Sequence, residues 1–523
     1  MYKPSPRVLE KKEKIARWQG LRASAFAEVG LDPVSLPALE EALFGTVVLP
    51  GDPDYDEARQ IFNTAFQAYP KIIAYCEVEN DVRLCLRWAT EWRRELGAES
   101  LPVTCRSGGH SYAGYSICDG MVVDLSRMND VHVDPGRKRL VVGPGARWEK
   151  IDAVLDFHRL HVPGGTCGTV AVGGFVQGGG YGFTSRRFGM NCDNVLAMRV
   201  MLADGRTVIA DPTRNRDLFW AMRGGTGNNF GVLLGVTYAL HELGDLWGFR
   251  LQWGMDLAPA VLQELQRSFT KTGPPKLGYL AGLTTDTRPD GKGTTPALVV
   301  FGMYDGPREE GLAAIEPLFA IGDPELQIDQ VASYLRLNHE VIEKPYPVPD
   351  PRDTSDVVRS AIISDLVTLG EWKTLCELFQ QAPNLGDFIC IEPYGGAINA
   401  VPAGANAFMH RDADMDLWAG SYWGTDDERP AAEEWLESLM VGHVQSMSND
   451  QSYQNYPNRT EIRFRSAYWA QYFPCLLRIK QKYDPHDFFH YQQCVSPAHG
   501  PAAPENEELC RELGVFDEVV DAG

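Results

Sequence analysis

The chain has 523 residues, of which 44% are hydrophobic and 23% charged, as expected for a globular protein of two or three domains. Its formal charge of −21 disfavours nucleic acid and anionic membrane surfaces as partners, because both select basic patches. It contains no run of about 18 apolar residues, so no membrane helix is predicted.

The N-terminal residues bear on where the protein is located, and the cysteines bear on whether it binds a metal ion. The first residues lack the apolar core of a secretory signal, so we expect a cytoplasmic protein if Met1 is the native start and a secreted one if a signal was removed. The odd count of eleven cysteines fits mostly reduced thiols. None of them forms a Cys-x-x-Cys pair, so no metal site is predicted. We expect a monomer or a weak homo-oligomer.

The first half of the chain reads as a glycine-rich α+β region that follows an N-terminal helical segment at 1–65. Helices are predicted at 82–96, capped by Asn80 or Asp81, and at 148–160. Short strands are predicted at 71–76, 102–105, 121–125 and 140–143, and a hairpin at 194–202 and 207–210. The region extends from about 66 to 244.

The pattern changes from about residue 245. Strands are predicted at 249–253, 297–303, 388–391 and 417–422, and helices at 259–269, 370–380 and 430–440. This order favours one antiparallel sheet with helices on one face, which leaves the other face free to cover a cofactor. The overall fold class is therefore α+β. The acidic tail at 498–523 is expected to be loosely held.

A loop of small residues at 106–116 contains His110. Consecutive small residues at the end of a strand can present several backbone N–H groups to one side and so bind a pyrophosphate. The alternative is a plain glycine turn in which His110 is hydrogen-bonded locally.

A second loop at 163–182 surrounds Cys167 with nine glycines. It is neither the Gly-x-Gly-x-x-Gly of a nicotinamide fold nor a P-loop, and its glycine density predicts backbone packed against a large ligand. N–H dipoles near Cys167 would favour its thiolate form, whereas the alternative is a buried, inert cysteine. A third glycine loop, at 217–232, offers Asn228 or Asn229 to a ligand.

Together these segments resemble the berberine-bridge-enzyme-like oxidases, within the vanillyl-alcohol-oxidase and p-cresol-methylhydroxylase type of flavoproteins. The resemblance runs from about Tyr55 to Pro497. It is carried by the motifs Arg106-Ser-Gly-Gly-His110, Cys167-Gly-Thr-Val-Ala-Val-Gly-Gly174, Gly178-Gly-Gly-Tyr-Gly182, Leu218-Phe-Trp-Ala-Met-Arg-Gly-Gly225, Glu392-Pro-Tyr-Gly-Gly396 and Tyr453-Gln-Asn-Tyr456.

The resemblance implies an FAD held by two covalent bonds, from His110 to the flavin 8α carbon and from Cys167 to C6. It also implies that a valine at position 170 allows oxygen to reach the flavin, which indicates an oxidase. The residues expected to bind the cofactor are Arg106, Ser107, Gly108, Gly109, His110, Ser111, Cys167, Val170, Gly173, Gly174, Gly178, Gly180 and Asn229.

The oxidation of an alcohol also needs a base for the hydroxyl proton. Tyr453 matches the first tyrosine of a segment that lines the active site in the family, and Tyr181 is a second candidate. A phenol working near pH 7 needs a pKa depressed by about three units, and Asp416 and Asp414 are candidate carboxylates to assist it. The alternative is that the tyrosines are aromatic walls. The strand at 415–422 has no glutamate where alkaloid-cyclising relatives carry their base, which disfavours that reaction.

The sequence thus predicts an FAD-dependent oxidase that takes hydride from an alcohol-type carbon of a small molecule and reduces O2 to hydrogen peroxide. A secondary metabolite is the favoured substrate, and the alternatives are an oligosaccharide oxidised to a lactone and a dehydrogenase of the same family. A flavin-storage protein and a nicotinamide reductase are disfavoured by covalent attachment and by the absent dinucleotide motif.

The resemblance also predicts the domain organisation. The FAD-binding domain is expected to comprise two small α+β subdomains at 66–244, to which the chain returns at 460–497. The substrate-binding domain is expected at 245–459.

Overall fold

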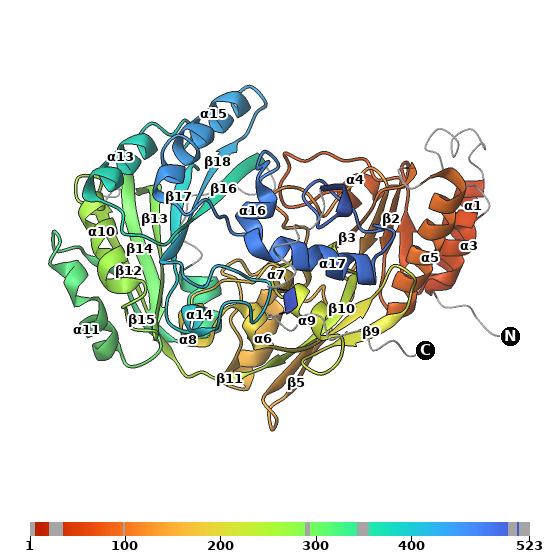
Figure 1. Cartoon of the computed structure of the whole chain (residues 1–523), viewed down its shortest axis with the longest axis horizontal. Coiled ribbons are helices and arrows are strands. Elements are labelled where there is room, and N and C mark those ends of the chain that lie inside the picture. The colour runs from red at the N-terminus through yellow and green to blue at the C-terminus, as the bar shows by residue number, and fades with distance from the viewer. Residues whose placement is uncertain are drawn as a thin grey trace.

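The computed structural model describes residues 6–19, 35–97, 100–287, 293–342, 355–499 and 510–511. Figure 1 shows two parts, one built on two small sheets and the other on a single large sheet. The chain combines helices and sheets, as the α+β prediction required. No helix among the described residues is both long and apolar enough to cross a lipid bilayer.

The first small sheet has the strand order β1-β2-β4-β3, with β1 antiparallel to β2 and the remaining pairs parallel. Its strands are β1 (Thr46–Val48), β2 (Ile72–Tyr75), β3 (Val103–Arg106) and β4 (Met121–Asp124). Helices α1 (Pro6–Gln19), α3 (Ser35–Ala42) and α5 (Glu79–Leu96) lie together beside it, and α4 (Tyr55–Ala58) precedes β2.

The start of α5 differs from the prediction. The helix begins at Glu79, so that Asn80 and Asp81 lie inside its first turn and neither is its cap. The Asp81 carboxylate still caps the helix, since it accepts a hydrogen bond of 3.4 Å from the backbone N–H of Val78, the residue before the helix. An acidic side chain can thus serve the free N–H groups from within the first turn as well as from the residue before it.

The second small sheet is antiparallel throughout, with the order β5-β6-β10-β8-β9. Its strands are β5 (Val131–Asp134), β6 (Arg139–Val142), β8 (Val195–Met201), β9 (Thr207–Ala210) and β10 (Val232–Ala239). The β8–β9 pair confirms the predicted hairpin, whereas β5 and β10 were not predicted.

Helix α6 (Trp148–Phe157) is shorter than predicted, because Leu160 and His161 form strand β7, which pairs with β11 (His241–Glu242). The other helical segments of this part are α7 (Val172–Gln177), α8 (Ser185–Phe188), the 3-10 turn Asn191–Asn194 and α9 (Arg216–Ala221).

The large sheet has seven strands in the order β15-β12-β14-β13-β17-β18-β16, and every neighbouring pair is antiparallel. Its strands are β12 (Leu246–Gly254), β13 (Leu277–Thr287), β14 (Thr294–Tyr304), β15 (Leu326–Ala332), β16 (Ser355–Ile363), β17 (Phe388–Pro393) and β18 (Met415–Trp423). The antiparallel prediction is confirmed, and β13, β15 and β16 were not predicted.

Four helices cover one face of the large sheet, as Figure 1 shows on its outer side. They are α10 (Ala258–Phe269), α11 (Arg308–Phe319), α13 (Leu369–Phe379) and α15 (Arg429–Met440). Between helices and sheet lies an apolar core that includes the buried Trp372, Leu375 and Leu436. Shorter helical turns are α12 (Tyr334–Arg336), the π-helical Leu337–Ile342, α14 (Ala397–Ala400) and the 3-10 turn Val444–Met447.

The C-terminal segment returns to the small-sheet part. It contains α16 (Phe464–Tyr468), the 3-10 turn Ala470–Tyr472, α17 (Phe473–Tyr483) and the turn Pro497–His499. The Lys480 ammonium donates to the carbonyl of Asn229 at 2.8 Å, which ties α17 to the loop before β10. A disulfide joins Cys475 to Cys510, which corrects the expectation of reduced thiols at that pair.

Candidate active site

A cavity of about 310 Å³, hereafter the central cavity, lies between the glycine loops and the open face of the large sheet. The loops contribute residues 107–112, several residues of 165–175, and several of 226–233. Strands β17 and β18 contribute Glu392 and Trp418, and residues 453–457 close another side. The cavity therefore joins segments that are hundreds of residues apart.

His110 and Cys167 both line the central cavity and are linked by one hydroxyl group. Thr169 Oγ1 lies 3.1 Å from His110 Nε2 and 3.3 Å from Cys167 Sγ. The His110 ring stacks on Phe62 with 4.3 Å between ring centroids. Two nucleophilic side chains predicted from separate motifs are thus brought to one wall of one cavity.

Burial lowers the pKa of His110 to about 4. At neutral pH the imidazole is therefore uncharged and keeps a lone pair on one ring nitrogen. A neutral imidazole is the form that can act as a nucleophile toward an electron-poor ring.

The glycines of the predicted cofactor site divide into two groups. Gly108, Gly109, Gly173 and Gly174 line the central cavity, together with Ser107, Ser111 and Val170. Gly108 packs so closely that a Cβ there would lie 2.8 Å from the backbone nitrogen of Ala171, and Gly109 has φ of +74°. These glycines bring two loops into contact and leave their backbone facing the cavity.

Gly178 and Gly180 lie outside the cavity lining. A Cβ on Gly178 would overlap the amide of Asn455, and the backbone N–H of Gly180 donates to Tyr453 Oη at 2.8 Å. The two glycines therefore pack against the segment that carries Tyr453.

Arg106 and Asn229 also lie behind the cavity wall. Arg106 is buried in an ion pair with Asp124 and donates to the carbonyl of Ala58 at 2.7 Å. The Asn229 amide donates to Thr226 Oγ1, and its oxygen accepts from the backbone N–H of Val495. These contacts brace the loops, and it is the neighbouring Asn228 that lines the cavity.

Tyr453 is buried at the cavity, and its phenol oxygen accepts hydrogen bonds from Gly180 N at 2.8 Å and Asn455 Nδ2 at 3.0 Å. Burial, with the nearby Glu392 charge, nevertheless raises the pKa of Tyr453 well above its usual value. This shift is opposite in direction to the one that a phenolic base near pH 7 needs.

Tyr181 also lines the cavity, but its hydroxyl donates to the carbonyl of Pro393 at 3.0 Å. Its ring lies nearly parallel to that of Tyr394, with centroids 5.8 Å apart. The phenol group is thus engaged by the backbone of β17, and burial raises its pKa well above 10.

Glu392 on β17 and Asp416 on β18 stand directly opposite each other in the antiparallel register. Such cross-strand neighbours have Cβ atoms about 4.5–5.5 Å apart. Glu392 lines the central cavity, whereas Asp416 is fully buried outside its lining. The sheet register therefore places a second carboxyl group beside the one that faces the cavity.

Burial raises the pKa of Glu392 to about 8, against the opposing effect of hydrogen bonds from Tyr456 and Trp418. The Tyr456 hydroxyl donates to Glu392 Oε1 at 2.6 Å. Burial and the charge of Glu392 raise the pKa of Asp416 well above its usual range. Because two adjacent buried carboxylates repel each other, the pair retains a proton at neutral pH.

Sequence reasoning placed Glu392 in a motif but gave it no role. One signal was present in the strand itself. In Phe388-Ile-Cys-Ile-Glu-Pro393 the isoleucines alternate with Cys390 and Glu392, so the glutamate shares the face that points away from the helical layer. A carboxyl group on the face free to cover a cofactor was a candidate for proton transfer.

Aromatic side chains form the wall around Glu392. Trp418 and Tyr456 stack with centroids 4.5 Å apart, and Tyr112 meets Tyr456 edge-on at 5.7 Å. These three rings line the central cavity. Flat aromatic faces beside a carboxyl group suit a ring-shaped substrate that carries a hydroxyl group.

The comparisons with known proteins agree with this geometry. A profile of the FAD binding domain matches residues 70–211, and a profile described as berberine and berberine like matches residues 452–496. The fold and the cavity thus define an FAD-linked oxidoreductase.

The xylooligosaccharide oxidase of Thermothelomyces thermophilus is 30% identical over 429 residues, which cover 77% of this chain and 83% of that protein. The uncharacterized FAD-linked oxidoreductase YgaK of Bacillus subtilis is 27% identical over 461 residues, covering 87% and 97%. A solved structure, that of BBE-like 1 from Physcomitrella patens, superposes with a TM-score of 0.78 at 23% identity, covering 88% and 98%. The chain belongs to the berberine-bridge-enzyme-like FAD-linked oxidases.

Proposed function

We propose that this protein is an oxidase whose FAD is attached covalently to both His110 and Cys167. The observation that carries the proposal is the shared hydroxyl of Thr169, within hydrogen-bond distance of both side chains on one cavity wall. The neutral state of the His110 imidazole supports it, because an uncharged ring nitrogen can form the bond.

Features of the cavity fit a large polar cofactor. The buried hydroxyl groups of Tyr115 and Ser116 line it without a hydrogen-bond partner among the described residues, and a ligand would satisfy them. The backbone of Gly108 and Gly109 can receive phosphate oxygens at the same wall. When bound, FAD supplies a hydride acceptor that oxygen can reoxidise with release of hydrogen peroxide.

We further propose that residues 66–244 and 460–497 form the FAD-binding domain and 245–459 the substrate-binding domain. The hydrogen bond from Lys480 to Asn229 and that from Trp469 Nε1 to the carbonyl of Gly224, at 3.0 Å, support the C-terminal return.

For the chemical step, Glu392 is the better supported proton acceptor. It faces the cavity, its pKa of about 8 suits a base at mildly alkaline pH, and Tyr456 holds its carboxylate in place. Tyr453, with its oxygen fixed by two N–H donors, orients the substrate hydroxyl. Asp416 remains protonated beside Glu392, and Tyr181 forms a wall.

The substrate proposed from these observations is a saccharide, oxidised at its anomeric carbon to a lactone. The aromatic faces of Trp418 and Tyr456 suit a sugar ring, and the xylooligosaccharide oxidase is a relative over most of the chain. This reverses the order expected from the sequence alone. A secondary metabolite with a benzylic or allylic alcohol is the second candidate, because the walls around Glu392 are aromatic.

Acid precipitation of the purified holoenzyme tests the cofactor proposal. Wild-type pellets should stay yellow, and peptide mapping should find flavin on positions 110 and 167. H110A and C167A should each retain one link, the double variant should release its FAD into the supernatant, and C118S should match the wild type. A colourless wild-type pellet contradicts the proposal.

A screen for peroxide with oligosaccharides and aromatic alcohols tests the substrate class. The same compounds, added under nitrogen, should bleach the flavin absorbance, which a storage protein would not show. If a substrate bleaches the flavin but air does not restore the colour, the protein is a dehydrogenase.

A further inference from the structure

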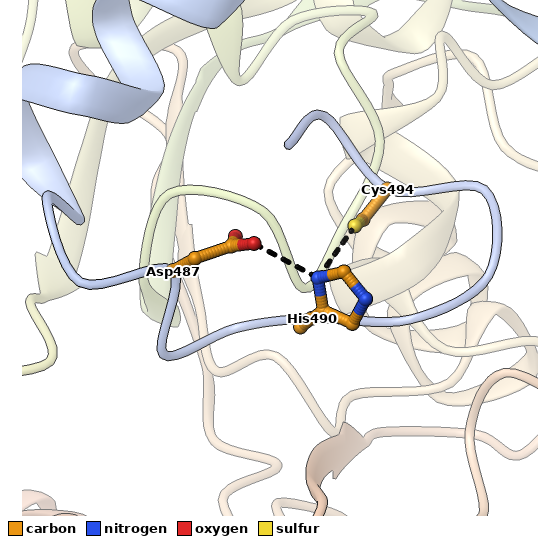
Figure 2. Close-up of side chains that lie close together, drawn as sticks. All are labelled: Asp487, His490 and Cys494. Carbon is orange, nitrogen blue, oxygen red and sulfur yellow. Dashed lines mark hydrogen bonds and ion pairs between the residues drawn. The ribbon is translucent and has the colours of Figure 1, made fainter. Parts of the chain in front are cut away.

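A cluster of metal-ligating side chains lies outside the central cavity, in the segment that follows α17. Asp487, His490, Cys494 and His499 follow one another within 13 residues. Figure 2 shows the carboxylate of Asp487 and the sulfur of Cys494 directed at the same nitrogen of the His490 ring. Among the described residues, no other group of three such side chains brings its ligand atoms this close together.

The distance between His490 and Cys494 is close to that between two ligands of a bound ion. His490 Nδ1 lies 2.9 Å from Asp487 Oδ2 and 3.5 Å from Cys494 Sγ, and His499 Nε2 lies 4.0 Å from the same sulfur. In a tetrahedral zinc site, bonds of about 2.3 Å to sulfur and about 2.0 Å to nitrogen place these two atoms about 3.6 Å apart. The ligand atoms of Asp487, His490 and Cys494 lie within 4.8 Å of one another and need only small shifts to surround one ion. His499 lies outside this group and would have to move toward it from its place beside the sulfur.

The first ligand, Asp487, is held in place by two neighbouring side chains. Lys480 contacts the other carboxylate oxygen of Asp487 at 3.0 Å, and the Ser496 hydroxyl donates to Asp487 Oδ2 at 2.5 Å. Lys480 is itself fully buried and paired with Asp484. Such outer contacts orient metal ligands in known sites.

The sulfur and the imidazole differ in exposure in a way that suits metal entry. Cys494 is fully buried, whereas the side chain of His490 is 44% exposed. A metal ion could therefore reach the buried sulfur past the partly exposed imidazole.

We propose that Asp487, His490, Cys494 and His499 bind one divalent metal ion of the zinc type. One thiolate, two imidazoles and one carboxylate form a donor set that zinc accepts in tetrahedral geometry. The spacing Asp-x2-His-x3-Cys-x4-His has no Cys-x-x-Cys pair, which is why the sequence predicted no metal.

The proposed metal site would stabilise part of the cavity wall, because residues between its ligands line the central cavity. Tyr491 and Gln493, between the ligands, line the central cavity, and Tyr491 Oη lies 3.0 Å from Thr226 Oγ1. A metal ion bound by residues on both sides of them would hold this part of the wall. The proposed ion is thus a clamp on the C-terminal segment and takes no part in the oxidation.

Cobalt binding to the untagged holoenzyme tests the proposal. The protein is dialysed against EDTA, then against metal-free buffer, and titrated with Co²⁺ at pH 7.5. We expect one Co²⁺ per chain, with tetrahedral d–d absorbance at wavelengths above the flavin bands and a thiolate-to-cobalt band in the difference spectrum. Added Zn²⁺ should abolish both signals and raise the Tm of the metal-free holoenzyme.

The variants C494S and H490Q should each lose the Co²⁺ absorbance and the Zn²⁺-dependent rise in Tm. C118S changes a thiol outside the cluster and should retain both. H490Q, at a partly exposed position, covers the case in which C494S fails to fold. Stoichiometry far below one, or a Co²⁺ spectrum that persists unchanged in C494S, overturns the proposal and leaves a hydrogen-bonded cluster without metal.

Discussion

The ionisation of Glu392 makes the pH dependence of substrate oxidation predictable. A base must be deprotonated to accept the substrate proton, and burial raises the pKa of this carboxyl group to about 8. We therefore expect kcat/KM to rise with pH and to level off above about pH 8. At pH 6 only about one molecule in a hundred carries the carboxylate, so kcat/KM should be about a hundredfold lower than at its plateau.

Three substitutions locate this titration in the structure. E392Q removes the base and should lower kcat/KM by about 10²–10⁴-fold on the plateau above about pH 8. Y456F removes a hydrogen bond that stabilises the carboxylate, so the midpoint of the profile should move to higher pH. D416N imitates a protonated Asp416, so the midpoint should stay near pH 8.

The assay is peroxide release at limiting substrate concentration, with anaerobic flavin reduction in a stopped-flow instrument as a check that oxygen is not limiting.

Measurement of the Tm separates a loss of catalysis from a loss of folding. The folded-state pKa of Glu392 lies above its unfolded value of about 4.5, so its contribution to stability is present below that value and is lost as pH rises through 8. E392Q should therefore gain Tm relative to the wild type at pH 9. A profile that is flat from pH 6 to 9, or full activity in E392Q, refutes the reasoning.

Other substitutions address the cofactor site. T169V removes a hydroxyl bond worth about 0.5–1.5 kcal/mol, so covalent FAD should form roughly twofold to tenfold more slowly, measured as flavin in acid pellets over time, and T169S should not differ from the wild type. G173A should lower the Tm, because its Cβ would overlap a serine side chain. The Cβ of G174A meets no described atom within 4 Å and points into open space beside the cavity, so this variant should fold normally but retain less FAD. Equal flavin content in G174A and the wild type would contradict this expectation. V170I should slow reoxidation by air without slowing anaerobic reduction, and unchanged reoxidation would remove the role given to Val170.

The sequence was sufficient for features whose chemistry is local. Glycine-rich loops around a histidine and a cysteine predict a backbone-lined ligand site wherever the loops lie, because small side chains and nucleophilic groups keep these properties in any fold. The hydrophobic periodicity likewise predicted the hairpin and the antiparallel order of the large sheet. His110 and Cys167 could be paired in advance through the family resemblance, and the contact through Thr169 came only with the structure.

Tertiary structure decided which polar groups face the cavity and in which ionisation state. The register of β17 against β18 sets Glu392 opposite Asp416, 24 residues further along the chain, and burial then raises the pKa of both carboxyl groups. Asn228 lines the cavity while its neighbour Asn229 braces the C-terminal segment, a distinction that depends on where Val495 lies. Side-chain pairing across strands and loss of solvent are properties of the assembled chain, so they could not be read from the sequence of either strand.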